Sequence, residues 1–188
     1  KIGTILPPLG LLYLAAELEK AGYGLKIFDT QIYDWNIKEA AGADVVGIYC
    51  NTSNYQRAVE LAEEIKNNFD IPIIFGGPHA TTRPLEVLNN SSVDYVVIGE
   101  GEVSVVELMD VLNNKSESKL SDVKGIGFKE NGQLVINPPR ELIENLDSIA
   151  FPARHLVPMD KYRPSPNQYK RLPMTTMMAS RGCPFGCT

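Results

Sequence analysis

The sequence predicts an α/β fold, an open and doubly wound parallel sheet with an edge hairpin and a proline-rich C-terminal strap. Short apolar runs alternate with helical patterns from residue 7 to residue 113, which is typical of a parallel sheet. The runs are apolar throughout, as expected for strands buried on both faces. One run ends in Gly76-Gly77, so the backbone can turn tightly at the edge where such sheets bind ligands.

The first helix is expected over residues 7–22, where leucine and alanine recur at helical spacing and Gly22 gives a C-terminal stop. Ser53 and Gln56 form a capping box, which predicts a helix over residues 53–69. Shorter helices are expected over residues 84–90 and 104–113. The expected strands are Leu25–Asp29, Asp44–Cys50, Ile71–Phe75 and Asp94–Ile98.

A hairpin is expected beyond the last helix, where Asn131-Gly132 separates the runs Val123–Phe128 and Leu134–Ile136. We expect this hairpin at an edge of the sheet. Residues 137–173 contain seven prolines and predict an extended strap rather than a second core. Residues 174–179 predict one more strand, which leads into the ending SRGCPFGCT.

The composition excludes several classes of protein. The 188 residues include 44% hydrophobic and 22% charged residues, so one globular domain with a substantial core is expected. The net charge of −5 and the absence of a basic run argue against nucleic-acid binding. No apolar stretch is long enough to span a membrane. Three cysteines, two of them close together at the end, favour a metal role in the reducing cytoplasm over a disulfide framework.

Polar or glycine-rich turns follow three of the expected strands. Gly76-Gly77 offers a bare floor with a polar lip over residues 78–82, and Asn51–Asn54 can hydrogen-bond a ligand. Gly99-Glu100-Gly101 follows the fourth strand. Each turn also has a plainer explanation, namely an ordinary strand-end turn, capping by Ser53, and acids that favour a helix N-terminus.

Cys183 and Cys187 are the candidate metal ligands, because thiolates bind iron or zinc and the neighbouring glycines let a backbone wrap a cluster. A lone C-x-x-x-C is a weak motif, and two unrelated reduced cysteines would look the same. Serine and cysteine nucleophiles, a Walker loop and a dinucleotide-binding G-x-G-x-x-G have no recognisable setting in this sequence. A phosphate- or flavin-binding module would need an acidic pocket or a phosphate loop after the first strand, and neither is visible.

The ordered motifs together resemble the cobalamin-binding radical S-adenosylmethionine (SAM) enzymes. PPLGLLYLAAELEKAGY, DVVGIYCNTSNY, IIFGGPHAT and DYVVIGEGE resemble their Rossmann-like, flavodoxin-type cobalamin-binding domain, and LDSIAFPARHLVPMDKY resembles the strap that follows it. The strand and SRGCPFGCT resemble the opening of the radical SAM barrel with its C-x-x-x-C-x-x-C signature. The resemblance implies a cobalamin-binding domain over residues 1–136, a strap over 137–173 and the start of the barrel over 174–188.

The resemblance also implies site residues at the strand ends, facing the corrin or the nucleotide tail of cobalamin. The implied cofactor-binding residues are Leu9, Gly10, Asn51, Thr52, Ser53, Gly76, Gly77, Pro78, His79, Gly99, Glu100 and Gly101. The family's D-x-H-x-x-G motif for a cobalt-binding histidine is missing, because the corresponding turn reads Leu6–Gly10. We therefore expect cobalt without a protein histidine ligand. Only Lys1–Leu6 precedes this turn, so either the first strand lies outside the sequence or Lys1–Leu6 is a loop after it.

By the same resemblance, Cys183 and Cys187 would bind a 4Fe-4S cluster that uses SAM in the full-length protein. The third cysteine would fall two residues beyond Thr188, so this fragment is not expected to hold the cluster or to be catalytically complete. The full enzyme, with its downstream barrel, would be a methyltransferase or an anaerobic cyclase acting on an organic substrate. The alternative is a module of the same fold that has lost cobalamin binding and serves as a structural or docking domain.

Overall fold

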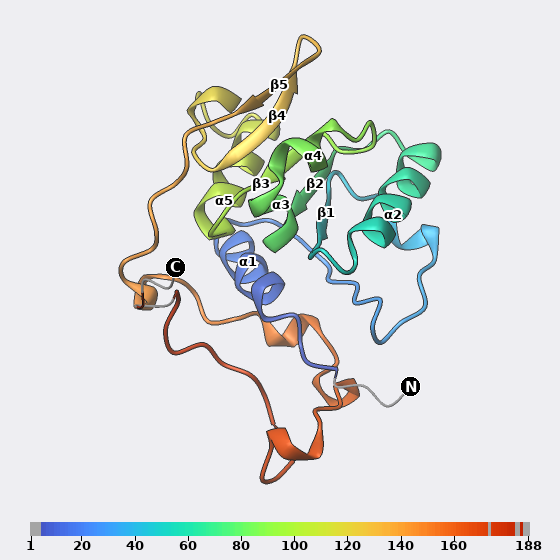
Figure 1. Cartoon of the computed structure of the whole chain (residues 1–188), viewed down its shortest axis with the longest axis vertical. Coiled ribbons are helices and arrows are strands. Elements are labelled where there is room, and N and C mark those ends of the chain that lie inside the picture. The colour runs from blue at the N-terminus through green and yellow to red at the C-terminus, as the bar shows by residue number, and fades with distance from the viewer. Residues whose placement is uncertain (1–4, 173, 183–184, 186–188) are drawn as a thin grey trace.

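A five-stranded sheet is the centre of the computed structural model, which describes residues 5–172, 174–182 and 185 (Figure 1). Its strand order is β1-β2-β3-β4-β5. The strands β1, β2 and β3 are parallel, and β4 and β5 are antiparallel to their neighbours. The strands are β1 (Val46–Tyr49), β2 (Ile73–Gly76), β3 (Tyr95–Val97), β4 (Ile126–Glu130) and β5 (Gln133–Ile136).

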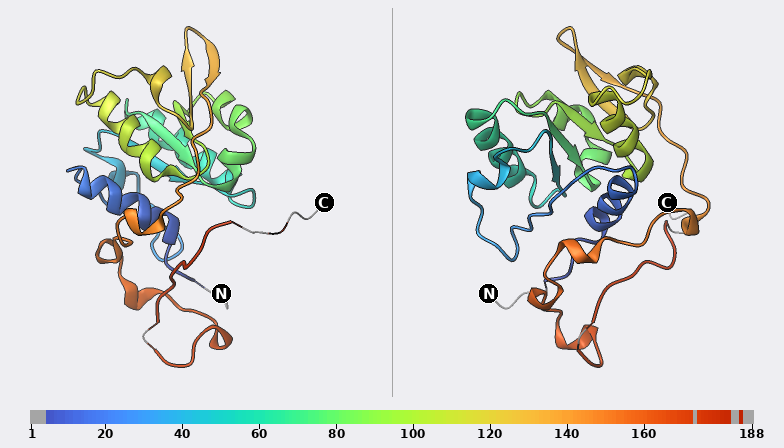
Figure 2. Two further views of the ribbon diagram at one scale, coloured as in Figure 1. Left: turned by 90° about the vertical axis from the view of Figure 1, so that its left-hand side faces the viewer. Right: turned by 180° about the vertical axis from the view of Figure 1, so that it is seen from behind.

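Helices cover both faces of the sheet, as Figure 2 shows, which confirms the doubly wound prediction. The fully buried Phe75 of β2 belongs to one apolar cluster with α2 and α4, whereas its neighbour Ile74 packs with Leu108 of α5. Side chains of successive strand residues point to opposite faces, so an apolar run is needed when both faces are covered. The helices are α1 (Leu9–Lys20), α2 (Tyr55–Asn68), α3 (Pro78–Thr82), α4 (Pro84–Asn89) and α5 (Gly101–Leu112).

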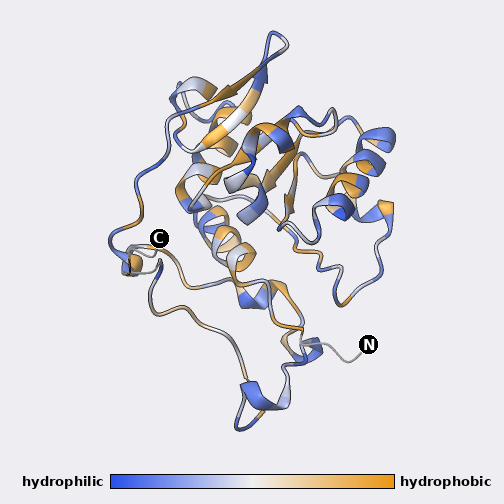
Figure 3. Ribbon diagram, viewed as in Figure 1, coloured by the Kyte–Doolittle hydropathy of each residue, from blue (hydrophilic) through white to orange (hydrophobic). Residues whose placement is uncertain are grey.

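The helix α1 lies beside α5 and ends where the sequence predicts. Gly22 has a positive φ of 82°, and the Tyr23 N–H donates to Leu18 O at 3.0 Å, which closes the helix end. The buried residues of α1 are Leu12, Ala15 and Ala16. Figure 3 shows the apolar residues gathered on the sheet and on the helix faces that meet it. No helix in the described part of the chain is long and apolar enough to cross a membrane.

The edge hairpin is also confirmed. Asn131 and Gly132 both have positive φ angles, 50° and 80°, and connect β4 to β5. Two positive φ angles in a two-residue loop match the twist of the paired strands, which explains the asparagine–glycine sequence. Because β5 is the last strand of the sheet, the hairpin forms one of its edges.

Two predicted strands are wrong. Leu25–Asp29 is extended but joins no sheet, and its Leu25 and Ile27 pack against apolar residues of α1 and of residues 150–159. Within the described residues β1 pairs only with β2, so no strand lies between β1 and Leu25–Asp29 to supply hydrogen-bond partners. The described residues from 174 to 179 form no strand either, since no neighbouring strand pairs with them.

The residues that follow β5 run alongside α1 (Figures 1 and 2). From Asn137 onward the described residues form only short 3-10 turns and one isolated bridge, between Ile5 and Arg163. The Ala150 N–H donates to a Glu17 carboxylate oxygen at 2.6 Å, and the Ala153 N–H donates to Leu12 O at 2.9 Å. The segment is thus held on α1 by backbone groups, although it has no regular structure of its own.

Tyr162→Phe is expected to destabilise the protein by about 1–2 kcal/mol, because a buried acid loses a hydrogen bond. The Tyr162 hydroxyl donates to Asp29 Oδ2 at 3.0 Å, and both side chains are buried. Burial and the neighbouring Asp29 carboxylate raise the pKa of the Tyr162 phenol above its ordinary value near 10. The folded state therefore favours the neutral phenol, and this contribution is complete below pH 10 and is lost as the pH rises further.

Urea unfolding of wild type and Tyr162→Phe from pH 8 to pH 11 measures both effects. Tyr169→Phe is the matched control, since Tyr169 lies in the same segment and makes no hydrogen bond among the described residues. Equal stabilities for Tyr162→Phe and Tyr169→Phe would contradict this account of Asp29.

Candidate functional site

Three turns meet at one edge of the sheet, because β1, β2 and β3 are parallel and end on the same side. We call this the strand-end edge, and it consists of Asn51–Ser53, Gly76–His79 and Gly99–Gly101. The Cys50 N–H donates to Gly76 O at 2.9 Å, and the His79 N–H donates to Cys50 O at 3.2 Å. The Gly99 N–H donates to Thr81 Oγ1 at 3.0 Å. The turns predicted to share a site are therefore joined to one another by hydrogen bonds.

The glycine pair has two different structural roles. Gly77 has a φ of 99°, and a Cβ there would lie 2.7 Å from Cys50 O and 2.8 Å from the Tyr49 ring. No other residue fits this close approach to the neighbouring strand. A Cβ on Gly76 or Gly99, in contrast, would meet nothing within 4 Å. These two positions leave bare, open backbone at the strand-end edge.

The Asn51–Asn54 turn is stabilised by its own side chains. Asn54 Oδ1 accepts from the Asn51 N–H at 2.7 Å, and Asn51 Oδ1 accepts from the Asn54 N–H at 3.0 Å. The Ser53 hydroxyl donates to Asn51 Oδ1 at 2.7 Å. The predicted capping box of Ser53 and Gln56 is therefore wrong, and α2 starts after Asn54 without a side-chain cap. Serine is drawn into the turn because an asparagine acceptor lies two residues away.

The predicted polar lip is a short helix, α3, and His79 points inward from it. The His79 ring is 6% exposed and lies 4.2 Å from the Tyr55 ring, centre to centre. His79 Nδ1 lies 3.3 Å from the Thr52 hydroxyl, and Nε2 lies 3.7 Å from Glu86 Oε1 without a hydrogen bond. Sequence reasoning does not identify Tyr55 as a site residue, since it occupies an ordinary helix position. The His79 ring is therefore packed inside the protein, against Tyr55 and Thr52.

The acids of the Gly99–Glu102 turn are paired with a cation from the end of the chain. The Arg181 guanidinium lies 3.2 Å from Glu100 Oε1 and hydrogen-bonds to Glu102, which is 5% exposed. Glu102 lies in the first turn of α5, which begins at Gly101, three residues before the predicted start. The sequence explanation of these acids as helix-terminal charges holds for Glu102, but it missed Arg181. No local pattern connects residues 79 positions apart.

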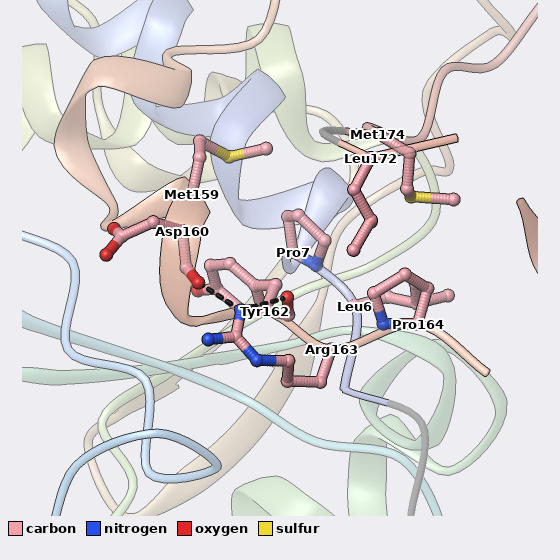
Figure 4. A pocket seen from close by; sticks show the side chains of 9 residues that line it. All are labelled: Leu6, Pro7, Met159, Asp160, Tyr162, Arg163, Pro164, Leu172 and Met174. Atoms are coloured by element: carbon pink, nitrogen blue, oxygen red, sulfur yellow. Dashed lines mark hydrogen bonds between the residues drawn. The ribbon is translucent and has the colours of Figure 1, made fainter. Parts of the chain in front are cut away.

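A cavity of about 300 Å³ lies beside Leu6 and Pro7, which precede α1 (Figure 4), and the predicted Leu9 and Gly10 are not among its lining residues. Leu9 is half-buried and Gly10 is exposed. The Arg163 guanidinium donates to the backbone oxygens of Asp160 and Tyr162, so its charge is engaged by the protein. The lining is mostly apolar, and its residues are Leu6, Pro7, Met159, Asp160, Tyr162, Arg163, Pro164, Leu172 and Met174.

Cys183 and Cys187 lie outside the described residues. Within the described part of the chain no group of three or more histidine, cysteine or acidic residues is arranged to hold a metal ion. Cys50 is a free and fully buried cysteine, and burial raises the pKa of its thiol. A raised pKa keeps the thiol protonated, so Cys50 acts as a small apolar residue of the core.

Comparisons with known proteins identify the family of this chain. Residues 1–109 match the family model described as the B12 binding domain. An uncharacterised methyltransferase of Pyrococcus horikoshii is 39% identical over 99% of this chain and 40% of its own length. The anaerobic magnesium-protoporphyrin IX monomethyl ester cyclase of Synechocystis is 29% identical over 97% of this chain and 37% of its own length. The chain thus spans about two fifths of these curated relatives.

Two solved structures share the fold. The radical SAM methyltransferase TsrM from Kitasatospora setae, with cobalamin and a [4Fe-4S] cluster bound, matches with a TM-score of 0.63 and 21% identity. That match covers 77% of this chain and 28% of TsrM. The radical SAM enzyme OxsB, with aqua-cobalamin and SAM bound, matches with a TM-score of 0.59 and 22% identity, over 73% of this chain and 20% of OxsB.

These findings confirm the resemblance and the Rossmann-like fold, and they do not favour a module that has lost its cofactor. The chain belongs to the B12-binding domain family and is similar to the cobalamin-binding portions of radical SAM methyltransferases and cyclases.

Proposed function

We propose that this chain binds cobalamin at the strand-end edge as part of a radical SAM enzyme, a methyltransferase or anaerobic cyclase acting on an organic substrate. The observation that carries the proposal is the open backbone at Gly76 and Gly99, locked in place by the close approach at Gly77. A corrin ring needs a surface that side chains do not obstruct, and the open backbone at these two glycines supports such a surface. Bound cobalamin would supply methyl-carrying or radical-assisting chemistry.

The site residues have distinct roles in this proposal. Gly76 and Gly99 form the floor, while Leu9 and Gly10 offer apolar surface at the start of α1. Asn51, Thr52 and Ser53 are the candidates for hydrogen bonds to amides or phosphate of the cofactor. The remaining members form and support the turns, and they are Gly77, Pro78, His79, Glu100 and Gly101. Because His79 is buried against Tyr55, we keep the expectation of cobalt without a protein histidine ligand.

We also propose the domain organisation and the further cofactors of the whole protein, on the basis of its relatives. Residues 1–136 would be the cobalamin-binding domain, 137–173 the strap, and 174–188 the start of the radical SAM barrel. TsrM and OxsB suggest a 4Fe-4S cluster and SAM as further cofactors, with Cys183 and Cys187 as cluster ligands. Such thiolates require a reducing compartment, which is consistent with the expected cytoplasm.

Reconstitution of the whole protein tests this function. We expect anaerobic incubation with hydroxocobalamin, iron and sulfide to give about one cobalt per chain after gel filtration, together with the visible absorbance of a four-iron cluster. A saturable shift of the cobalamin absorbance bands would measure the affinity. A whole protein that retains no cobalt at high hydroxocobalamin concentration would refute the proposal and would revive the structural or docking alternative.

A further inference from the structure

Arg181 brings the C-terminal end of the described chain back to the strand-end edge, where three groups surround its guanidinium. Nη1 lies 3.2 Å from Glu100 Oε1, Nη2 bonds to Glu102, and the guanidinium carbon lies 5.3 Å from the centre of the Tyr13 ring. The side chain of Arg181 is 17% exposed. A planar guanidinium can bind two carboxylates and stack on an aromatic ring at once, which a lysine cannot do.

Both acids are engaged by the protein rather than by open solvent. Glu100 Oε2 accepts from the Ile143 N–H at 2.6 Å, while Oε1 pairs with Arg181. Glu100 therefore holds the C-terminal segment at two points, residues 143 and 181. Glu102 is buried and needs a cation, and Arg181 provides it. Glu100 and Glu102 thus hold the C-terminal segment in place.

The sequence places this contact directly before the candidate cluster ligands. Cys183 follows Arg181 by two residues, and two residues span at most about 7 Å. The turn that holds Arg181 starts at Gly99, one of the two bare glycines of the strand-end edge. A cation held at Glu100 and Glu102 therefore anchors Arg181, which lies two residues before Cys183 in the sequence, at the turn that begins with Gly99.

We propose that the Glu100–Arg181–Glu102 cluster is a positioning device, which sets the distance between the cysteine loop and bound cobalamin. This inference rests on the proposed function. In this proposal Arg181 touches neither cofactor and acts only through the cysteine loop. The predicted consequence is that both cofactors bind without Arg181 but lose their fixed relative placement.

Backbone nuclear magnetic resonance relaxation on the cofactor-free whole protein tests whether Arg181 holds the segment in place. We expect Arg181→Met to lower the order parameters of backbone amides between residues 174 and 182 to below about 0.6. Arg171→Met is the matched control, because Arg171 is exposed and has no ion pair among the described residues. Equal order parameters in the two variants would overturn the proposal, whether or not cobalamin binds.

A distance measurement on the protein loaded with both cofactors tests whether Arg181 fixes their relative placement. Pulsed electron paramagnetic resonance between cob(II)alamin and the reduced cluster should give one narrow distribution in wild type and in Arg171→Met. Arg181→Met should broaden this distance distribution. Arg181→Lys should give an intermediate width, because a lysine ammonium keeps the positive charge but lacks the planar, two-pronged geometry of the guanidinium. An unchanged distribution in Arg181→Met would refute the positioning role alone, whereas a wild type that binds no cobalamin would refute the proposed function.

Discussion

Gly77→Ala is expected to lower the free energy of unfolding by about 3 kcal/mol or more and to abolish cobalamin binding. At a φ of 99°, a side chain strains the backbone, and its Cβ would lie 2.7 Å from the Cys50 carbonyl oxygen. That oxygen accepts the His79 N–H and belongs to the neighbouring strand end, so it cannot move away without breaking the strand-end edge. Urea unfolding and hydroxocobalamin titration measure the two effects.

Gly22→Ala is the matched control for Gly77→Ala. Gly22 also has a positive φ, of 82°, but a Cβ there would meet nothing within 4 Å. The control therefore carries the backbone strain without the clash and should cost about 1 kcal/mol. A Gly77→Ala variant that is no less stable than Gly22→Ala would show that the close approach does not require glycine.

Gly76→Leu is expected to weaken hydroxocobalamin binding by about tenfold or more, roughly 1.4 kcal/mol, while the stability changes by less than about 1 kcal/mol. A Cβ on Gly76 would meet nothing within 4 Å, so the substitution brings no clash at the backbone and is expected to leave folding intact. The same side chain would occupy the floor on which the corrin is proposed to lie. Titration of the whole protein, followed by visible absorbance, measures the affinity.

Gly47→Leu provides the control for Gly76→Leu. Gly47 lies in β1, before the carboxyl end of the strand, and a Cβ there also meets nothing within 4 Å. Its affinity for hydroxocobalamin should equal that of wild type. Wild-type affinity in Gly76→Leu would place the corrin elsewhere, and the apolar cavity beside α1 would then be the next candidate.

The sequence predicts the elements that depend on local chemistry. Gly22 ends α1, and Asn131-Gly132 makes the hairpin turn, because both sites need a positive φ that few residues adopt. The apolar runs predict the strands β1, β2 and β3, since burial on both faces leaves no polar alternation. Their common direction then places three turns at one edge, which the parallel pairing confirms.

The wrong predictions share one physical cause, which is that the structure of each segment depends on the residues with which it can form hydrogen bonds. Leu25–Asp29 has the composition of a strand, but a strand needs a neighbour with free hydrogen-bonding groups, and none of the described strands lies beside it. Asp29, to which the sequence assigned no role, is the buried acceptor of Tyr162, 133 positions away. Ser53 donates to Asn51 Oδ1 and does not cap α2, because the helix starts one residue later, after Asn54.

The amino-acid sequence by itself determined the α/β class, the glycine-rich turns and the ordered motifs that point to a B12-binding domain. Those features arise from backbone sterics and from apolar periodicity, which act over a few residues. Only the tertiary structure decided that His79 is buried behind Tyr55 and that Arg181 joins Glu100 and Glu102. Long-range contacts of charged and aromatic side chains depend on how distant segments fold against each other, and no local pattern encodes that.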